Sequence, residues 1–198
     1  MAGRERKPQE PARLVLGAMS RRFARLRPGA PPFAPGDYGV PSDGMCLSAF
    51  LVVTAPTDPS RVLLGRMAPN PRWEEVGGLD PARTRRIADR WMLPSRQLQF
   101  FESPEEAARG IGEEQLGIQV DPVPTPRIFS ETYPRPASAE SDPHWDLHFI
   151  FVLTGPASPP RSPLWRELTY VSVGTLSRGT FARGHGDILE LVGLSPAA

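Results

Sequence analysis

The chain has 198 residues, of which 39% are hydrophobic and 23% charged, and its formal net charge is +1. This size and composition indicate one globular domain with an appendage, and the near-neutral charge argues against bulk attraction to nucleic acid. No apolar run approaches the roughly 18–20 residues of a membrane span. Leu14-Val15-Leu16 is too short for the core of a secretory signal. The single cysteine, Cys46, excludes disulfides within the chain and cysteine-based zinc sites. We therefore expect a cytoplasmic protein.

Residues 1–44 are predicted to be an arginine- and proline-rich extension outside the domain. Apolar residues recur there at helical spacing and predict a short amphipathic helix over 11–27; they are Leu16, Met19, Phe23 and Leu26. The apolar side of this helix would dock on the domain or on a partner subunit, as in a homodimer. The alternative is contact with an anionic surface. The proline-rich stretch 28–41 is predicted to be an irregular connector.

Two strands are predicted at the start of the domain. Residues 45–54 form an apolar run that ends in β-branched side chains, and residues 61–67 form a second one. Together they indicate a hairpin with a loop of about six residues. Residues 68–90 then form an insertion, in which a helix starts at Asp80-Pro81 and runs through Ala88, while residues 73–75 lie in the loop before it.

The stretch 91–118 combines a strand, a loop and a helix with a defined start. Ser103 stands where an N-cap belongs, Pro104 takes the first helical position, and Glu106 follows the cap by three residues. This pattern is a capping box, which predicts that a helix begins at residue 103. Acidic residues presented from a loop–helix junction are the ligands that hard cations such as Mg²⁺ prefer.

Further elements follow the helix. A short strand is predicted at 127–132, a strand in the centre of the sheet at 144–154 and another strand at 168–173. Asp187 is predicted to cap a final helix over 188–192. The predicted fold class is mixed α/β, with a sheet and at least one helix packed on it.

The spacing of Glu102, Glu114 and the closing Gly117-Ile118 matches a known motif. It resembles the box of the Nudix hydrolase superfamily, G-x5-E-x7-R-E-U-x-E-E-x-G-U, in which U is a bulky aliphatic residue. The resemblance implies a Nudix-like α/β/α sandwich with a mixed β-sheet over residues 45–198. It also implies a Mg²⁺ or Mn²⁺ ion held by the helix glutamates, and a nucleoside-diphosphate-like small molecule as the ligand.

Several positions depart from the box. Without gaps, Arg96 stands at its first glycine, Gly110 at its arginine, Ile111 at the first helix glutamate and Gln115 at the third. A register shifted by one residue requires a deletion and an insertion, and it replaces the first helix glutamate by Gly110. We favour the ungapped register. It predicts that the helix buries Ala108, Gly112 and Leu116, whereas the shifted register predicts Ala107, Ala108 and Ile111.

The candidate site residues follow from the box. Glu114 and Glu113 are the candidate catalytic residues, and the same two glutamates with Glu102 are the candidate metal ligands. Arg96 is a candidate ligand-binding residue because a guanidinium can pair with a phosphate through two nitrogens.

A second group lies on the strand 144–154. His144, Asp146 and His148 alternate, so they would share one face of that strand. His144 and Asp146 are candidate ligand-binding residues, in a transition-metal site or an acid–base pair. The alternative is ordinary packing of His148 in the strand. His185 is predicted to lie on the surface.

Two main functions follow. The first is a Nudix-superfamily protein with a degenerate box, weakly catalytic or non-catalytic, that binds a nucleotide-like ligand or a partner. The alternative is an active divalent-metal-dependent hydrolase of nucleoside diphosphate-linked compounds, which completes its site with carboxylates from elsewhere, such as Glu113, Glu140 or Asp146. A more distant third is an interaction module that uses the arginine-rich extension.

Overall fold

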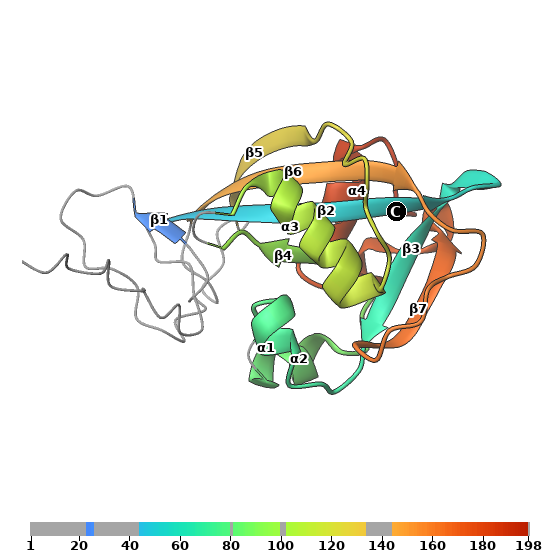
Figure 1. Ribbon diagram of the computed structural model, residues 1–198, viewed down its shortest axis with the longest axis horizontal. Helices are drawn as coiled ribbons and strands as arrows, with labels where there is room; N and C mark the ends of the chain where they lie inside the picture. Colours follow the sequence, from blue (N-terminus) through green and yellow to red (C-terminus); the bar gives the residue numbers. More distant parts are fainter. Residues whose placement is uncertain (1–22, 26–43, 80, 100–101, 134–143, 198) are drawn as a thin grey trace, which may run out of the picture.

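The computed structural model describes residues 23–25, 44–79, 81–99, 102–133 and 144–197. Within these residues, seven strands form a single sheet with the main order β5-β6-β2-β3-β7, and β1 and β4 each pair with β2 outside that order (Figure 1). The strands are β1 (Phe23–Arg25), β2 (Gly44–Ala55), β3 (Asp58–Met67), β4 (Ser95–Gln97), β5 (Arg127–Tyr133), β6 (His144–Thr154) and β7 (Trp165–Ser172).

β2 is the centre of the sheet. It runs parallel to β6 from Met45 to Thr54 and antiparallel to β3, while β5 pairs with β6 and β7 with β3 in antiparallel fashion. The sheet is therefore mixed. Leu51, Val52 and Val53 are fully buried, as expected for a strand that is covered on both faces.

Helices cover the two faces of this sheet. α3 (Pro104–Gly110) continues into the π-helical turn η1 (Ile111–Leu116), and both pack on the face that carries Ala49, Leu51 and Val53. α4 (His185–Leu191) packs on the opposite face, against Phe50 and Val52. The predicted α/β/α sandwich with a mixed sheet is thereby confirmed.

The insertion between β3 and β4 is helical at two places. α2 (Pro81–Ile87) is the helix that the sequence predicts. Residues 73–75 were predicted in a loop, and this is wrong because they belong to α1 (Trp73–Val76). Trp73 is 1% exposed, and its indole N–H donates a hydrogen bond of 3.0 Å to the carbonyl of Leu164, which anchors the turn against the end of β7.

Other boundaries differ from the sequence-based expectation. Ala55 pairs with Asp58, so the β2–β3 turn is shorter than the predicted six-residue loop. The side chain of Asp58 accepts hydrogen bonds from the backbone and hydroxyl of Ser60, at 3.0 and 2.6 Å, and these fix the start of β3. α4 begins after Gly184, whose φ is 69°, so Asp187 lies inside the first turn instead of capping it.

Of residues 1–44, which were predicted as an extension outside the domain, the structure describes Phe23–Arg25 and Gly44. Phe23–Arg25 were predicted at the end of a helix, and this is wrong because they pair as β1 with the first residues of β2. The rest of the predicted helix and the connector 28–41 lie outside the described residues. In the described part of the chain, no helix is long and apolar enough to cross a lipid bilayer. Two short 3-10 turns, η2 (Val173–Thr175) and η3 (Arg178–Thr180), connect β7 to α4.

Candidate functional site

The helix α3 starts at the predicted capping box. The hydroxyl of Ser103 accepts a hydrogen bond of 3.1 Å from the backbone N–H of Glu106, and the Glu106 carboxylate accepts one of 2.7 Å from the backbone N–H of Ser103. The hydrogen bond from the Ser103 backbone is the main reason why the pKa of Glu106 is lowered. This cap fixes the helix directly after Glu102, so the box loop and the box helix are joined rigidly.

The box helix changes its winding halfway. After Gly110 the chain forms the π-helical turn η1, which ends at Gly117 with a φ of 70°. The ungapped and the shifted register of the box both assume an α-helix throughout, and each predicts a different set of core residues. In the structure both sets are buried. These buried residues are Ala107, Ala108, Ile111, Gly112 and Leu116. A π-turn inserts extra chain into a helix, so residues from both predicted faces reach the same core.

Three of the predicted site residues meet around one guanidinium. Arg96 lies on β4 and is 5% exposed. Its Nη1 donates a hydrogen bond of 2.9 Å to Glu114 Oε2, and its Nη2 donates to Glu102 Oε1. The second oxygen of Glu102 accepts a hydrogen bond of 2.7 Å from the backbone N–H of Gln99. Arg96 therefore faces two carboxylates of its own chain.

The two box positions that lack glutamate have other roles. Ile111 is fully buried in the core between the helix and the sheet. Gln115 is also fully buried, and its amide donates hydrogen bonds of 2.9 Å to the carbonyls of Val76 and Ser95 and accepts one of 3.2 Å from the backbone N–H of Ser95. Gln115 thus joins the box helix to α1 and β4.

This residue set does not fit a divalent cation. Mg²⁺ requires clustered oxygen ligands in near-octahedral geometry. The retained carboxylates of Glu102 and Glu114 are paired with Arg96, while Ile111 and Gln115 supply no carboxylate. Among the described residues, no group of three or more His, Cys, Asp or Glu side chains is arranged to hold a metal ion.

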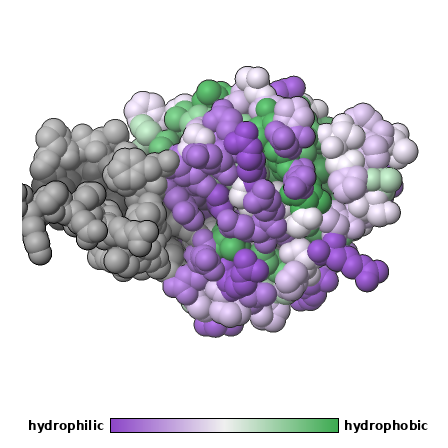
Figure 2. Space-filling model, in the orientation of Figure 1, coloured by the Kyte–Doolittle hydropathy of each residue, from purple (hydrophilic) through white to green (hydrophobic). Residues whose placement is uncertain are grey.

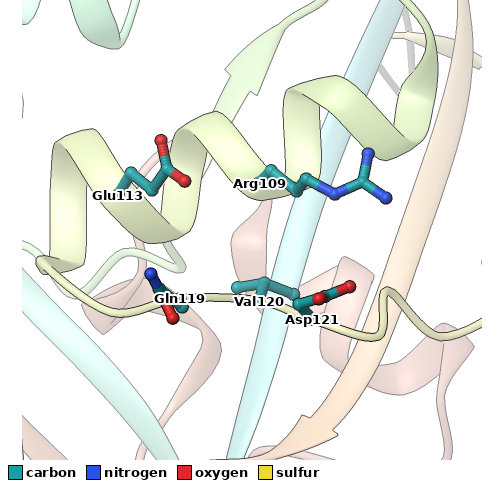
Figure 3. A pocket seen from close by; sticks show the side chains of 5 residues that line it. All are labelled: Arg109, Glu113, Gln119, Val120 and Asp121. Atoms are coloured by element: carbon teal, nitrogen blue, oxygen red, sulfur yellow. The ribbon is translucent and has the colours of Figure 1, made fainter.

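Glu113 lies apart from Arg96 and its carboxylates. It is exposed and lines a hollow of about 390 Å³ together with Arg109 on the helix and Gln119, Val120 and Asp121 on the chain that follows. Figure 3 shows the two helical side chains beside that following segment. The surface over α3 is mostly hydrophilic in Figure 2. Glu113 is therefore accessible to solvent, but it does not share a ligand set with Glu114 here.

Asp146 lies on the other face of the sheet. In the ladders Asp146 pairs with Cys46, whereas Arg96 pairs with Ala49. Since side chains alternate between the faces of a strand, Asp146 faces α4 and Arg96 faces α3. The side chain of His144 and all of Glu140 lie outside the described residues.

A buried polar group surrounds Asp146. The sequence predicted that Asp146 and His148 share one face of the strand, but it did not predict that Glu131 and Cys46 lie beside them. His148 is 5% exposed, and its Nε2 lies 3.2 Å from the carboxylate of Glu131. Burial and the charge of Asp146 raise the pKa of the Cys46 thiol to about 12. The alternation of Cys46 and Ser48 within an otherwise apolar strand was the available signal for a polar face.

His185 was predicted on the surface, and this is wrong. It is 1% exposed, and its Nδ1 accepts a hydrogen bond of 2.9 Å from the backbone N–H of Leu93. Burial is the largest cause of a pKa that lies well below the usual histidine value, and the charges of Arg183 and His148 add to it. His185 is therefore a neutral hydrogen-bond acceptor that joins α4 to the strand-like segment before β4.

No protein-family model matches this sequence, and no curated protein matches it either. Solved structures do match. The chain is similar to a MutT protein from Methanosarcina mazei Go1, with 18% identity and a TM-score of 0.49 over 74% of this chain and 91% of the other. It is similar to the Nudix hydrolase RenU from M. smegmatis, with 19% identity and a TM-score of 0.46 over 77% of this chain and 88% of the other.

A third similar structure is a bifunctional NMN adenylyltransferase/ADP ribose pyrophosphatase from Francisella tularensis, in complex with AMP and a Mn ion. Its identity is 18% and its TM-score 0.44, over 82% of this chain and 42% of the other. Similarities of this size transfer no ligand or activity to this chain. The layers and strand order described above, with the box helix on one face of a mixed sheet and α4 on the other, are those of the α/β/α sandwich that the resemblance to the Nudix superfamily implied.

Proposed function

We propose that this chain is a Nudix-superfamily protein with a degenerate box, whose hydrolytic activity is weak or absent. In this proposal it works in the cytoplasm by binding a nucleoside-diphosphate-like ligand or a protein partner. The observation that carries the proposal is the burial of positions 111 and 115, where the box would present two metal-binding glutamates and this chain has Ile111 and Gln115.

The two buried residues prevent the box helix from binding a metal ion in the usual way, each for its own reason. Ile111 places an apolar side chain in the core, and Gln115 uses both ends of its amide to hold α1 and β4. Neither residue has a carboxylate, and both side chains are buried inside the protein. A single exposed glutamate such as Glu114 cannot by itself bind Mg²⁺ tightly or lower the pKa of a metal-bound water.

Ligand binding without hydrolysis is supported by the hollow beside the box helix. This hollow of about 390 Å³ is open to solvent, so a ligand bound there would keep part of its surface in contact with water. Arg109 offers a cation to a phosphate, while Glu113 and Asp121 offer acceptors to the hydroxyl and amino groups of a nucleoside.

The test is a hydrolysis assay on the full chain. A panel of nucleoside diphosphate-linked compounds is incubated with Mg²⁺ or Mn²⁺, and release of product is compared between the wild type and Glu114→Gln. We expect no metal-dependent turnover in the wild type, and a rise in melting temperature with at least one nucleotide in the absence of metal. Metal-dependent turnover that Glu114→Gln abolishes would overturn the proposal.

One observation favours the alternative of an active hydrolase. Glu113 and Asp121 line the same hollow, so two carboxylates are accessible away from Arg96. An enzyme built on them would lose activity in Glu113→Gln and Asp121→Asn and keep it in Glu114→Gln. Metal-dependent turnover by the wild type therefore separates the two functions, and the variant that abolishes it shows which carboxylates carry the activity.

A further inference from the structure

This inference deepens the proposed function and concerns two departures from the box that are distant in sequence but lie against each other in space. In the ungapped register, Arg96 stands at the first glycine of the box and Gly110 at its arginine. In the structure the guanidinium of Arg96 lies against the Cα of Gly110. A Cβ built on Gly110 would be 2.6 Å from Cζ of Arg96 and closer still to Nη2. No side chain at position 110 can coexist with the present position of this guanidinium.

We propose that the arginine and the glycine are exchanged as a compensated pair, and that Arg96 is the resident cation of the box. Its guanidinium pairs with both Glu102 and Glu114 in place of a divalent ion, and Gly110 leaves the space that it occupies. The remaining negative charge is carried at Glu114, whose side chain is 41% exposed to solvent. The pair of glutamates is then a latent divalent-cation site that the arginine keeps closed.

Burial and charge support this role. Arg96 is 5% exposed, and the side chain of Glu102 is 12% exposed. Charged groups so deeply buried are retained only when they are paired, because their desolvation is costly. The planar fork of arginine can address two carboxylates through separate nitrogens, as Nη1 and Nη2 do here. A guanidinium also stays protonated in proteins, and it belongs to the chain, so the pairing does not depend on the concentration of any metal.

The first test removes the resident cation. Arg96→Ala leaves Glu102 and Glu114 facing a space that Mn²⁺ can enter, so Mn²⁺ should bind to this variant and stabilise it. At a Mn²⁺ concentration a hundred times the Kd, the melting temperature should rise by about 5–10 °C. The wild type should show no such rise. Arg96→Ala combined with Glu114→Gln is the matched control, and there the effect should disappear. Binding is read directly by the loss of the free Mn²⁺ signal in electron paramagnetic resonance.

The second test asks whether positions 96 and 110 are coupled. Gly110→Ala should lower the melting temperature by several degrees in the wild type, because the new methyl group displaces the guanidinium from its carboxylates. In the Arg96→Ala background the same change should be neutral or stabilising, since alanine is the better helix former by about 1 kcal/mol. If Arg96→Ala fails to fold, Arg96→Gln removes the charge and is too short to reach the space beside Gly110, so it serves in both tests.

Two results would overturn the inference. One is an equal effect of Gly110→Ala in both backgrounds, and the other is an equal Mn²⁺ shift in the wild type and in the arginine variants. Neither measurement uses turnover. Hydrolysis by the wild type would therefore refute the proposed function and leave the coupling of Arg96 and Gly110 to be judged on its own result.

Discussion

Gln115→Glu restores the third helix glutamate of the box with one substitution. We expect this variant to be less stable than the wild type and to gain no metal-dependent hydrolysis. The amide of Gln115 donates two hydrogen bonds of 2.9 Å, to the carbonyls of Val76 and Ser95. A carboxylate in the same place donates none and directs negative charge at both carbonyls. The new group would therefore be buried without the donors that its neighbours require.

The size of the effect follows from these contacts. Two buried carbonyls lose their donors, and each costs roughly 1–3 kcal/mol, with more if the carboxylate remains charged. A total of about 3–5 kcal/mol is reasonable, because the new group can take up a proton and donate one bond back. For a chain of this size, this free energy lowers the melting temperature by roughly 6–20 °C.

The pH dependence gives an independent check. Burial against two carbonyls raises the folded-state pKa of the new carboxyl above its unfolded value of about 4.3. The loss of stability relative to the wild type is therefore smallest below that unfolded value, and it grows as the pH rises towards the folded value.

The assay is thermal unfolding of both proteins between pH 4 and pH 8. Gln119→Glu is the matched control, because Gln119 is exposed and the same substitution there should change stability by no more than about 0.5 kcal/mol. A Gln115→Glu variant that melts with the wild type at pH 8, or that gains Mn²⁺-dependent hydrolysis, would refute this reasoning.

Three other predictions concern single residues elsewhere in the protein. Ser103→Ala should destabilise the protein by about 1 kcal/mol through loss of the helix cap, and the pKa of Glu106, followed by nuclear magnetic resonance, should return upwards. His185 has a lowered pKa in the folded state. Its contribution to stability is therefore complete above the unfolded pKa of about 6.5, and it is lost as the pH falls below that value. The stability of His185→Gln, measured by thermal unfolding, should depend less on pH in that range. The Cys46 thiol, with its pKa raised to about 12, should react with a thiol reagent at pH 8 only at the rate at which the protein opens, and addition of denaturant should remove that protection.

Much of the fold could be predicted because its signals are local. The apolar runs of β2 and β6 and the capping box at Ser103 each lie within a few consecutive residues. The cap of α4 could not be predicted in this way. Its helix starts after Gly184 in a left-handed conformation, whereas Asp187 is a favourable N-cap residue by type alone.

The candidate site was harder to predict because its contacts are distant in sequence. Arg96 pairs with Glu114, 18 positions away, and a sequence shows the arginine without its partner. Gln115 and His185 are polar residues that become buried only through hydrogen bonds to other elements. The π-turn was also missed, since a helical wheel assumes one period along the whole helix.

The parallel pairing of β2 with β6 has a consequence for how the chain acquires its structure. Thr54 and Leu153, which are hydrogen-bonded across this ladder, are 99 positions apart. Contacts of such long sequence separation form late, because a long loop must close before they contribute any stability. The box helix is synthesised before β6. The sheet on which this helix packs lacks β6, the parallel neighbour of β2, until residue 154 has been synthesised. A chain cut before His144 should therefore remain unfolded.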